Sequence, residues 1–303
     1  MTAFPDLDHE LAALAAAACW AATGILSAAP SGRLGAIAFN RVRQVTVTLL
    51  LALYVVATGT WRGLGADMIL PLILSGLIGI FVGDTLLFTA LNRIGPRRAG
   101  ILFALNAPIA AVLGFLFLDE TLPPLALLGI GLTVAGVMLA IFFGKRPGQS
   151  ARLEAVNGPL WIGVALGLGA ATGQAAGSII ARPVMAAGVD PFAASMLRVG
   201  VAAACLSLVM LLPFGAVKPK TALTFRLFGQ TALTGVLAMG MGMTLLLYAL
   251  SGGKVGIVST LSATSPVLIL PLLWITTGER PAHGAWAGAL LVAAGMTVLF
   301  LGA

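Results

Sequence analysis

The chain repeats itself at a fixed spacing. A nine-residue segment, GDTLLFTAL (residues 83–91), returns as GMTLLLYAL (residues 242–250), and six of the nine residues are identical. The two copies lie 242 − 83 = 159 residues apart in a chain of 303 residues. Three further pairs keep this spacing: Glu120 and Glu279, Gly129 and Gly288, and Gly136 and Gly295. A period close to half the chain indicates one structural unit that is built twice.

The composition places both copies in a membrane. Hydrophobic residues make up 59% of the chain and charged residues only 9%, which is too little charge for a soluble domain of this length. The apolar runs are about 20 residues long, the length of helix that crosses a hydrocarbon core about 30 Å thick. No ten-residue alternation typical of a β-barrel is present. We therefore expect an all-α, multi-pass integral membrane protein.

Ten spanning helices are predicted from the apolar runs and from the residues between them. Proline suits the start of a helix and glycine the position after its end, and both punctuate the runs. The predicted spans are 11–29, 35–58, 67–92, 96–117, 123–143, 159–187, 191–213, 227–251, 255–276 and 283–301. Each copy holds five, and an odd number of spans forces the second copy into the bilayer upside down. Two inverted five-helix repeats are the architecture of secondary transporters.

Basic residues gather on alternate connections between the spans. The first, third, fifth, seventh and ninth connections, with the start of the second span, hold 13 Lys and Arg residues, and the other connections hold Arg62, Arg182 and Lys254. Because Lys and Arg mark the cytoplasmic side, the bias places both termini outside. The formal net charge of +7 is thus a topology signal, and we expect membrane lipid and no nucleic acid as partners.

Three charged residues lie inside predicted spans and are candidates for substrate binding or coupling. Asp84 and Arg41 fall at similar depth, so they either form a fixed ion pair or leave Asp84 free to accept a coupling proton. Arg198 is the counterpart of Arg41, but Met243 occupies the position that matches Asp84. Arg198 therefore either receives an acid group of the substrate, or extends along its helix toward the interface or contacts Asp190.

Polar residues near the midplane complete the set of candidate site residues. Pro108 and Pro266 interrupt the fourth and ninth predicted helices, and transporters place substrate sites at such interruptions. The residues that either line a site there or hydrogen bond between helices are Asn106, Ser262 and Ser265. Those that either complete the wall of a cavity or only pack are Trp20, Thr23, Gln174 and Tyr248.

The chain resembles the EamA-like branch of the drug/metabolite transporter superfamily. The resemblance rests on the two repeats, on the acidic corners LFLDETL (residues 116–122) and WITTGERP (residues 274–281), and on Arg41 and Arg198. It departs from the family pattern at Asp119, where the family has glycine. The resemblance implies an EamA-like repeat over 9–144, a linker over 145–157 and a second repeat over 158–302, in a bacterial inner (plasma) membrane.

The predicted function is that of a secondary active transporter that exports or exchanges a small organic metabolite, amino acid-like or related, by alternating access. No nucleotide-binding loop is present, so the energy source is a proton gradient or a counter-substrate. We expect no catalytic residue, metal or cofactor. An intramembrane enzyme is the alternative from another class, but paired carboxylates are missing. A passive channel or membrane scaffold stays open as well.

The charge bias predicts the orientation in the membrane, although transporters that resemble this chain are usually drawn with both termini inside. A fluorescent protein fused after the last residue should stay dark, because it would be exported before folding. The same protein inserted into the 145–157 linker should fluoresce. A bright terminal fusion with a dark linker insertion would contradict the assignment.

Overall fold

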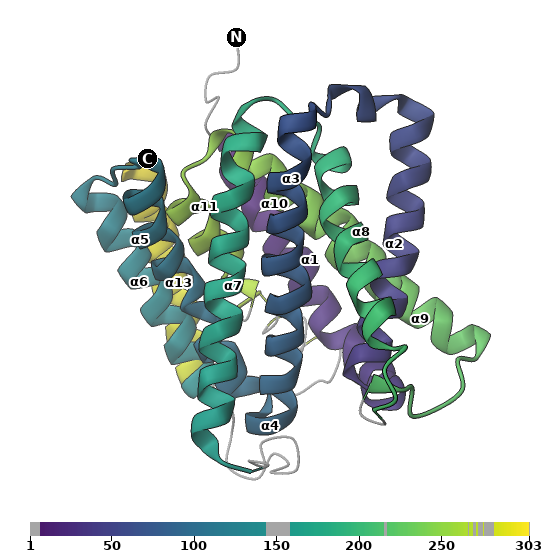
Figure 1. Ribbon diagram of the computed structural model, residues 1–303. Helices are drawn as coiled ribbons and strands as arrows, with labels where there is room; N and C mark the ends of the chain where they lie inside the picture. The colour runs from purple at the N-terminus through teal and green to yellow at the C-terminus, as the bar shows by residue number, and fades with distance from the viewer. Residues whose placement is uncertain are drawn as a thin grey trace.

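The computed structural model describes residues 7–143, 158–214, 217–265, 267, 268, 271, 275 and 282–302 (Figure 1). Every element in these ranges is helical. Pro266, Glu279 and the predicted linker lie outside the described residues.

The first half contains eight elements: α1 (Leu7–Leu34), α2 (Ala36–Thr58), η1 (Thr60–Gly63), α3 (Ala66–Ser75), η2 (Gly76–Val82), α4 (Gly83–Ala104), α5 (Asn106–Leu118) and α6 (Pro124–Phe142). The second half contains seven described elements: α7 (Leu160–Ala186), α8 (Pro191–Val209), α9 (Phe225–Gly235), η5 (Val236–Gly242), α10 (Met243–Gly252), α11 (Val255–Ser262) and α13 (His283–Gly302).

Among the described residues, five stretches are long and apolar enough to cross a membrane: Ala36–Thr58, Ala66–Ala90, Leu160–Ala186, Pro191–Val209 and Phe225–Gly252. Three shorter apolar helices accompany them: Leu102–Leu118, Pro124–Leu139 and His283–Val298. The multi-pass, all-helical class is therefore as predicted, while the number of ten spans stays a prediction.

The boundary between the third and fourth predicted spans is wrong. Helix α4 continues through Pro96 and ends only at Ala104. Pro108 explains the position of the interruption, because it has no N–H to donate to the carbonyl four residues earlier, at Ala104. Leu105 instead donates its N–H to Leu102 at 3.2 Å. The second half is interrupted at the matching place, where α11 ends at Ser262.

A widened helical turn stands at the centre of each half. Elements η2 and η5 are seven-residue π-helices that continue α3 and α9. They occupy matching positions, since 236 − 76 = 160, and each leads directly into one of the two repeated nonamers. π-helices are rare and are frequently found at functional sites. The residue after each nonamer's first glycine is Asp84 in one half and Met243 in the other.

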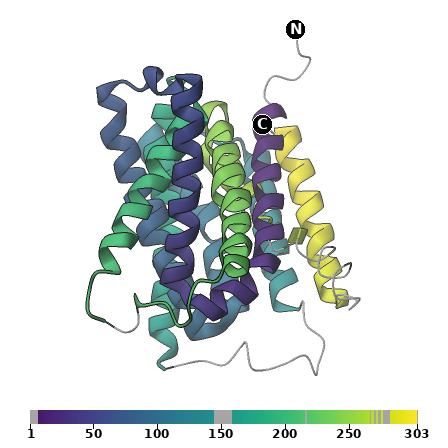
Figure 2. The ribbon, with the colours of Figure 1, turned by 90° about the vertical axis from the view of Figure 1, so that its right-hand side faces the viewer.

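The two ends of the bundle differ in charge. Helix α1 begins and α13 ends at the same end, and α7 begins at the opposite end (Figures 1 and 2). At that opposite end, Lys220 donates its backbone N–H to Leu34 and Thr221 donates its hydroxyl to Arg33. The corner after α1 and the connection after α8 are thereby joined, and both carry basic residues.

Helices α6 and α13 contact each other through glycines at reciprocal positions. A Cβ added at Gly136 would lie 2.8 Å from the Gly288 carbonyl oxygen, and one added at Gly295 would lie 2.9 Å from that of Gly129. The two contacts are images of each other, because Gly136 and Gly295 are partners at the 159-residue spacing and so are Gly129 and Gly288. Because the lower number in α6 meets the higher number in α13, the two helices are antiparallel.

A second pair of glycines holds the two halves together at the centre. A Cβ at Gly76 would lie 2.7 Å from Cα of Arg198, and a Cβ at Gly235 would lie 3.2 Å from Cα of Arg43. The glycines are repeat partners, since 235 − 76 = 159. The arginines also hold matching places, since 198 − 43 = 155 and their helices begin 191 − 36 = 155 residues apart. Each half thus packs the glycine at the start of its π-helix, Gly76 in η2 or Gly235 just before η5, on the arginine of the other half.

This packing predicts a position-specific effect of adding a methyl group to α6. In Gly136→Ala the new methyl would meet the backbone N of Val292 at 2.7 Å, whereas at Gly131 in the same helix nothing lies within 4 Å. We expect Gly136→Ala to lower the free energy of unfolding by about 1–3 kcal/mol. Gly131→Ala should leave it nearly unchanged. Thermal unfolding of the two variants in detergent checks this, and equal effects would contradict the reciprocal packing.

Candidate substrate site

A group of charged and amide side chains is buried where α2, α4 and α8 meet. Asn40, Arg43 and Gln44 lie on one face of α2, because residues three and four apart in a helix share a face. Asp84 is the second residue of α4 and is half-buried, with its Oδ2 atom fully buried, and Arg198 lies on α8. Arg198 is 0% exposed and Arg43 is 4% exposed. We call these five residues the buried charge cluster.

The contacts of the cluster connect the two halves of the chain. The Asn40 amide lies beside the carboxylate of Asp84, and the charges of Arg43 and Arg198 lie close enough to act on that carboxylate. Arg198 also directs Nη1 to the sulfur of Met243 at 3.3 Å. The Arg43 guanidinium lies 5.2 Å from the centre of the Phe39 ring. Asp84 forms no direct ion pair with either arginine in the described part of the chain.

The cluster has an unusual shortage of hydrogen-bond partners. Nine buried side-chain polar atoms lack one among the described residues, and seven of them belong to the cluster. They are Asn40 Oδ1, Arg43 Nε, Gln44 Nε2 and Oε1, Asp84 Oδ2, and Arg198 Nε and Nη2. Since buried polar groups are nearly always paired, such a concentration marks a place where a ligand or water supplies the missing partners.

The expected pairing of Arg41 with Asp84 is wrong. Arg41 donates from Nε to the Ser207 hydroxyl at 3.1 Å and lies near the sulfur of Met210. Residues two apart in a helix point about 200° apart, so Arg41 and Arg43 face opposite sides of α2. Arg41 was selected because its depth in the membrane matches that of Asp84. The face of α2 that points toward Asp84 selects Arg43 instead.

Arg198 lies where it was expected but with a different neighbourhood. It faces Met243, as the repeat register predicted. It does not extend to the interface, and Asp190 instead accepts hydrogen bonds from the N–H groups of Phe192 and Ala193. The charge of Asp84 lies close enough to act on Arg198 as well as on Arg43, although it forms no ion pair with either arginine in the described part of the chain.

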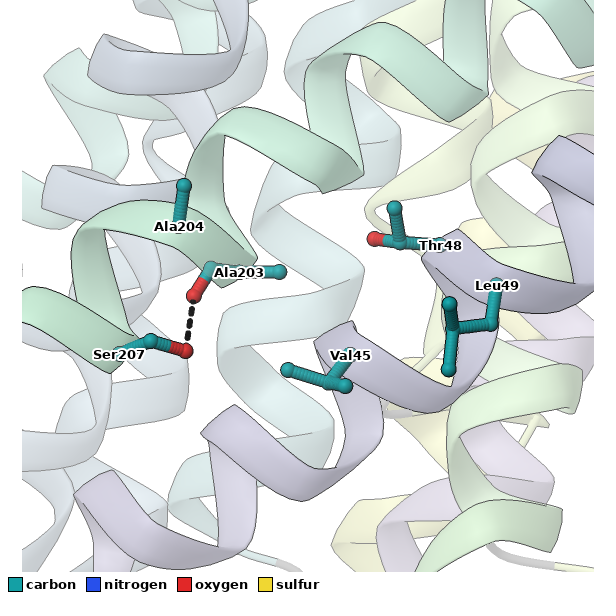
Figure 3. Close-up of a pocket in the computed structure, with 6 residues that line it drawn as sticks. All are labelled: Val45, Thr48, Leu49, Ala203, Ala204 and Ser207. Carbon is teal, nitrogen blue, oxygen red and sulfur yellow. Dashed lines mark hydrogen bonds between the residues drawn. The ribbon is translucent and has the colours of Figure 1, made fainter.

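Two cavities lie beside α2, and the smaller one touches the cluster. A small one of about 10 Å³, the size for one water molecule, is lined by Ala36, Ile37, Asn40, Thr85, Phe88, Thr89 and Leu206. It touches Asn40 and the residue that follows Asp84. A larger groove of about 240 Å³ runs between α2 and α8 and is lined by Val45, Thr48, Leu49, Ala203, Ala204 and Ser207 (Figure 3). Its hydroxyls bond to their own helices, so it offers little chemistry.

The candidates on α1 and α10 are spread over the bundle. Trp20 donates its indole N–H to the Ala238 carbonyl of η5 at 2.9 Å, and buried Thr23 bonds to the Trp20 carbonyl. Tyr248 is 40% exposed and stacks on His9, with 5.1 Å between ring centres. The side chain of Tyr248 therefore lies with the start of α1 and not with Trp20.

The glycines between η2 and α7 bring two further parts of the site together. A Cβ at Gly79 would lie 3.2 Å from Cα of Gly177, and one at Gly83 would lie 3.7 Å from the backbone N of Gln174. The same added Cβ at Gly79 would lie 3.3 Å from Nη2 of Arg198. Glycine here lets α7 and the guanidinium approach the π-helix closely.

Asn106, Ser262 and Ser265 each donate a hydrogen bond to the carbonyl three residues earlier in the chain. Asn106, at the start of α5, donates to Phe103 near the end of α4 at 2.7 Å, and Ser262 donates to Ser259 at 3.1 Å. Ser265 donates to the Ser262 carbonyl at 3.2 Å. These side chains lie at the two helix interruptions and do not join the buried charge cluster.

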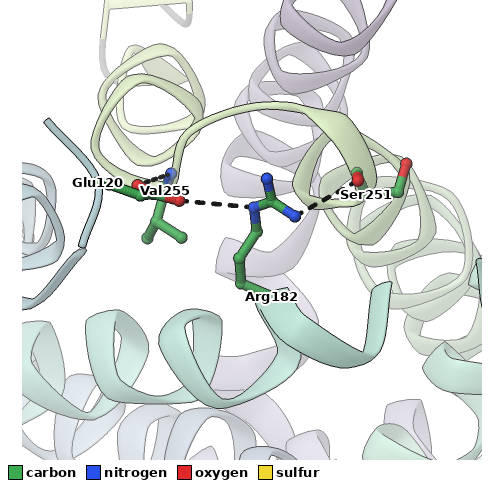
Figure 4. A network of polar contacts seen from close by, with 4 residues as sticks. All are labelled: Glu120, Arg182, Ser251 and Val255. Atoms are coloured by element: carbon green, nitrogen blue, oxygen red, sulfur yellow. Dashed lines mark hydrogen bonds and ion pairs between the residues drawn. The ribbon is translucent and has the colours of Figure 1, made fainter. Parts of the chain in front are cut away.

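A polar network closes the end of the bundle opposite the basic connections. Glu120, which follows α5, accepts the N–H of Val255 at the start of α11 at 2.8 Å. Its other oxygen lies 3.6 Å from Nε of Arg182, whose Nη1 donates to the Ser251 carbonyl at 3.4 Å (Figure 4). The acidic corner of the first half is thus fixed to α7, α10 and α11 of the second half.

Comparison with known proteins agrees with this arrangement. A multi-pass, all-helical bundle made of two like halves defines the class of membrane transporters built from repeats. The sequence matches the EamA-like transporter family over residues 9–142 and again over 161–301. The chain belongs to that family.

Its fold is also that of a solved crystal structure at a TM-score of 0.80, with 18% sequence identity, 97% of this chain and 96% of the other covered. At this identity the likeness shows the fold alone. No match was found among curated proteins.

Sequence reasoning missed three residues of the cluster: Asn40, Arg43 and Gln44. The signal was present in the three-and-four spacing of the polar residues in an otherwise apolar helix. The register of α2 against α8 also pairs Arg43 with Arg198. Aligning the two halves at the starts of α2 and α8 would have selected Arg43 as the partner of Arg198.

Burial raises the pKa of Glu120 above the ordinary value of 4.5, while the Val255 N–H, Arg182 and Lys254 oppose the rise. The folded protein therefore holds this proton more readily than the unfolded chain. The free energy of unfolding should fall as pH increases from about 4.5 through the raised value. Glu120→Gln should lose that part of the pH dependence, and Asp119→Asn, an exposed neighbour, should keep it. Thermal unfolding across this pH range provides the measurement.

Proposed function

We propose that this protein is a secondary active transporter that moves a small organic metabolite by alternating access, with its substrate site at the buried charge cluster. The observation that carries the proposal is the set of seven unpartnered polar atoms at the centre of the bundle. Such a set is costly in a membrane interior unless a ligand or water completes it. The arginines that contribute to it come from matching positions in the two halves.

We propose further that the two halves are inverted repeats. The reciprocal glycine contacts between α6 and α13 support this, because a two-fold axis produces contacts in which residue i meets residue j of the other copy and vice versa. The antiparallel direction of the two helices requires an axis that lies across them. The elements α3 and η2 also run toward the end where α7 begins, and α9 and η5 run away from it (Figure 1).

Alternation between two states needs contacts that permit sliding. The crossing of η2 with α7 is made by glycines, which hold few side-chain contacts that resist movement. Each π-helix carries an extra residue in its turn, a common place for a helix to bend. The network of Glu120 closes one end, and the contact of Lys220 with Leu34 lies at the other. Opening either end would expose the cluster from that side.

The coupling partner is a proton or a counter-substrate, and both roles fit a carboxylate at position 84. As a proton acceptor, Asp84 would lose its charge on one side of the membrane and recover it on the other. As a fixed counter-charge, it would only hold the arginines in place. The structure offers no second buried carboxylate beside it among the described residues, which does not favour aspartyl protease chemistry.

Transport in liposomes tests the proposal. Purified protein should mediate counterflow of at least one solute from a panel of amino acids, organic acids and aromatic metabolites. If Asp84 couples protons, Asp84→Asn should keep counterflow but reduce pH-driven accumulation by about tenfold or more. Asp67→Asn, an exposed carboxylate in α3, is the matched control and should behave as wild type.

If Asp84 is only a counter-charge, Asp84→Asn should lower the folded yield, and the double change with Arg43→Gln should recover part of it. Protein that folds well yet transports nothing across the panel, with or without a pH gradient, would contradict the proposed function.

A further inference from the structure

The buried charge cluster is short of one negative charge. It contains two guanidinium groups, which stay protonated in proteins, and a single carboxylate. Arg43 and Arg198 are 4% and 0% exposed, so water at the surface does not compensate them. A charge buried without a partner is strongly unfavourable, and proteins that keep one usually bind an ion of opposite sign there. The count therefore calls for one more anion.

The free donors have the right number and kind for a carboxylate. Arg198 leaves Nε and Nη2 unpartnered, which are two of the donors along one side of the guanidinium. Arg43 leaves Nε unpartnered. Two parallel N–H groups of one arginine fit the two oxygens of a carboxylate, and this pairing is among the strongest charge-assisted hydrogen bonds. A spherical halide uses such a pair less fully.

The remaining unpartnered atoms describe the rest of the ligand. Asp84 Oδ2 and Asn40 Oδ1 are free acceptors, and the Gln44 amide has both a free donor and a free acceptor. A hydroxyl or another hydrogen-bond donor near the carboxylate would satisfy the acceptors. A purely hydrocarbon tail would leave these buried acceptors unpaired, which is unfavourable.

We propose that the cluster binds the carboxylate of a small, polar organic monoanion between Arg43 and Arg198, with one arginine contributed by each half of the chain. This inference rests on the proposed function and names the chemical class of its substrate. Besides its proposed part in coupling, Asp84 then supplies the protein's own negative charge to the two guanidiniums before the substrate binds.

Equilibrium binding to the purified full-length protein tests the inference. The probe is sodium lactate, with lactamide as its uncharged analogue and sodium chloride as the halide. Lactate should raise the unfolding temperature in a saturable way, as any ligand of the native state does. Lactamide should have no effect, and chloride should act only at much higher concentration. Isothermal titration calorimetry gives the affinities independently of folding.

Variants locate the binding to the cluster. Arg43→Gln and Arg198→Gln should each weaken lactate binding roughly ten- to a hundred-fold, because each removes a charged hydrogen-bond donor. Arg198→Lys should bind lactate with an affinity between those of Arg198→Gln and wild type. Arg41→Gln is the matched control, an arginine two residues away on the opposite face of α2, and should bind lactate as wild type does. Asp84→Asn should bind it more tightly, since the protein's own negative charge is gone.

Three outcomes would each overturn the inference: equal effects of lactate and lactamide, equal affinity for lactate and chloride, or unchanged lactate binding by well-folded Arg198→Gln. The first two are measured on wild-type protein, so the inference can be tested even if a variant folds poorly. The proposed function fails separately. Lactate binding without flux of any solute contradicts transport alone, whereas Asp84-dependent flux without lactate binding contradicts only the carboxylate class.

Discussion

The buried guanidinium of Arg198 constrains how the helices around it pack. Arg198 has no exposed surface and keeps two nitrogen atoms without a partner, in a setting where such a group is expensive. The cluster contains one carboxylate, Asp84, which is the second residue after the π-helix η2, and the Asn40 amide lies beside it. The charge of Asp84 acts on the guanidinium only because the π-helix passes close to α8. Glycine at positions 76 and 79 makes that passage possible.

The packing of Gly76 is repeated in the second half. Gly76 packs on the backbone of Arg198 and Gly235 packs on that of Arg43, so each half supplies the surface that accommodates the other's arginine. The likeness of the halves is broken at one position, where Asp84 in the first half corresponds to Met243 in the second. In the proposed site, two like cations and one anion would give a preference for a negatively charged ligand.

Much of the fold follows from the sequence, because its signals are long and physical: apolar runs of bilayer length, a 159-residue spacing, and prolines that interrupt helices. The site was only partly predictable. Asp84 and Arg198 stood out as charges in apolar helices, but Arg41 was selected by depth, a measure that ignores which face of α2 it occupies. Arg43 satisfies both. The π-helices had no recognised sequence signal, since a widened turn differs from an α-helix by one residue's hydrogen bonding. Tyr248 was an aromatic residue whose position along the helix did not reveal its contact with His9.

The central claim is that the two halves contribute equivalent arginines to one site that needs a single carboxylate. Exchanging the residues at positions 84 and 243, where the two halves differ, tests it most directly. Asp84→Met removes the carboxylate from the first half. Met243→Asp, beside Arg198, supplies a carboxylate from the second half. Counterflow by the double variant in liposomes is the measurement. The account predicts that Asp84→Met alone loses most transport and that the double variant regains a substantial part of it for the same solute. A double variant that folds as well as the single one and transports no better would contradict the claim.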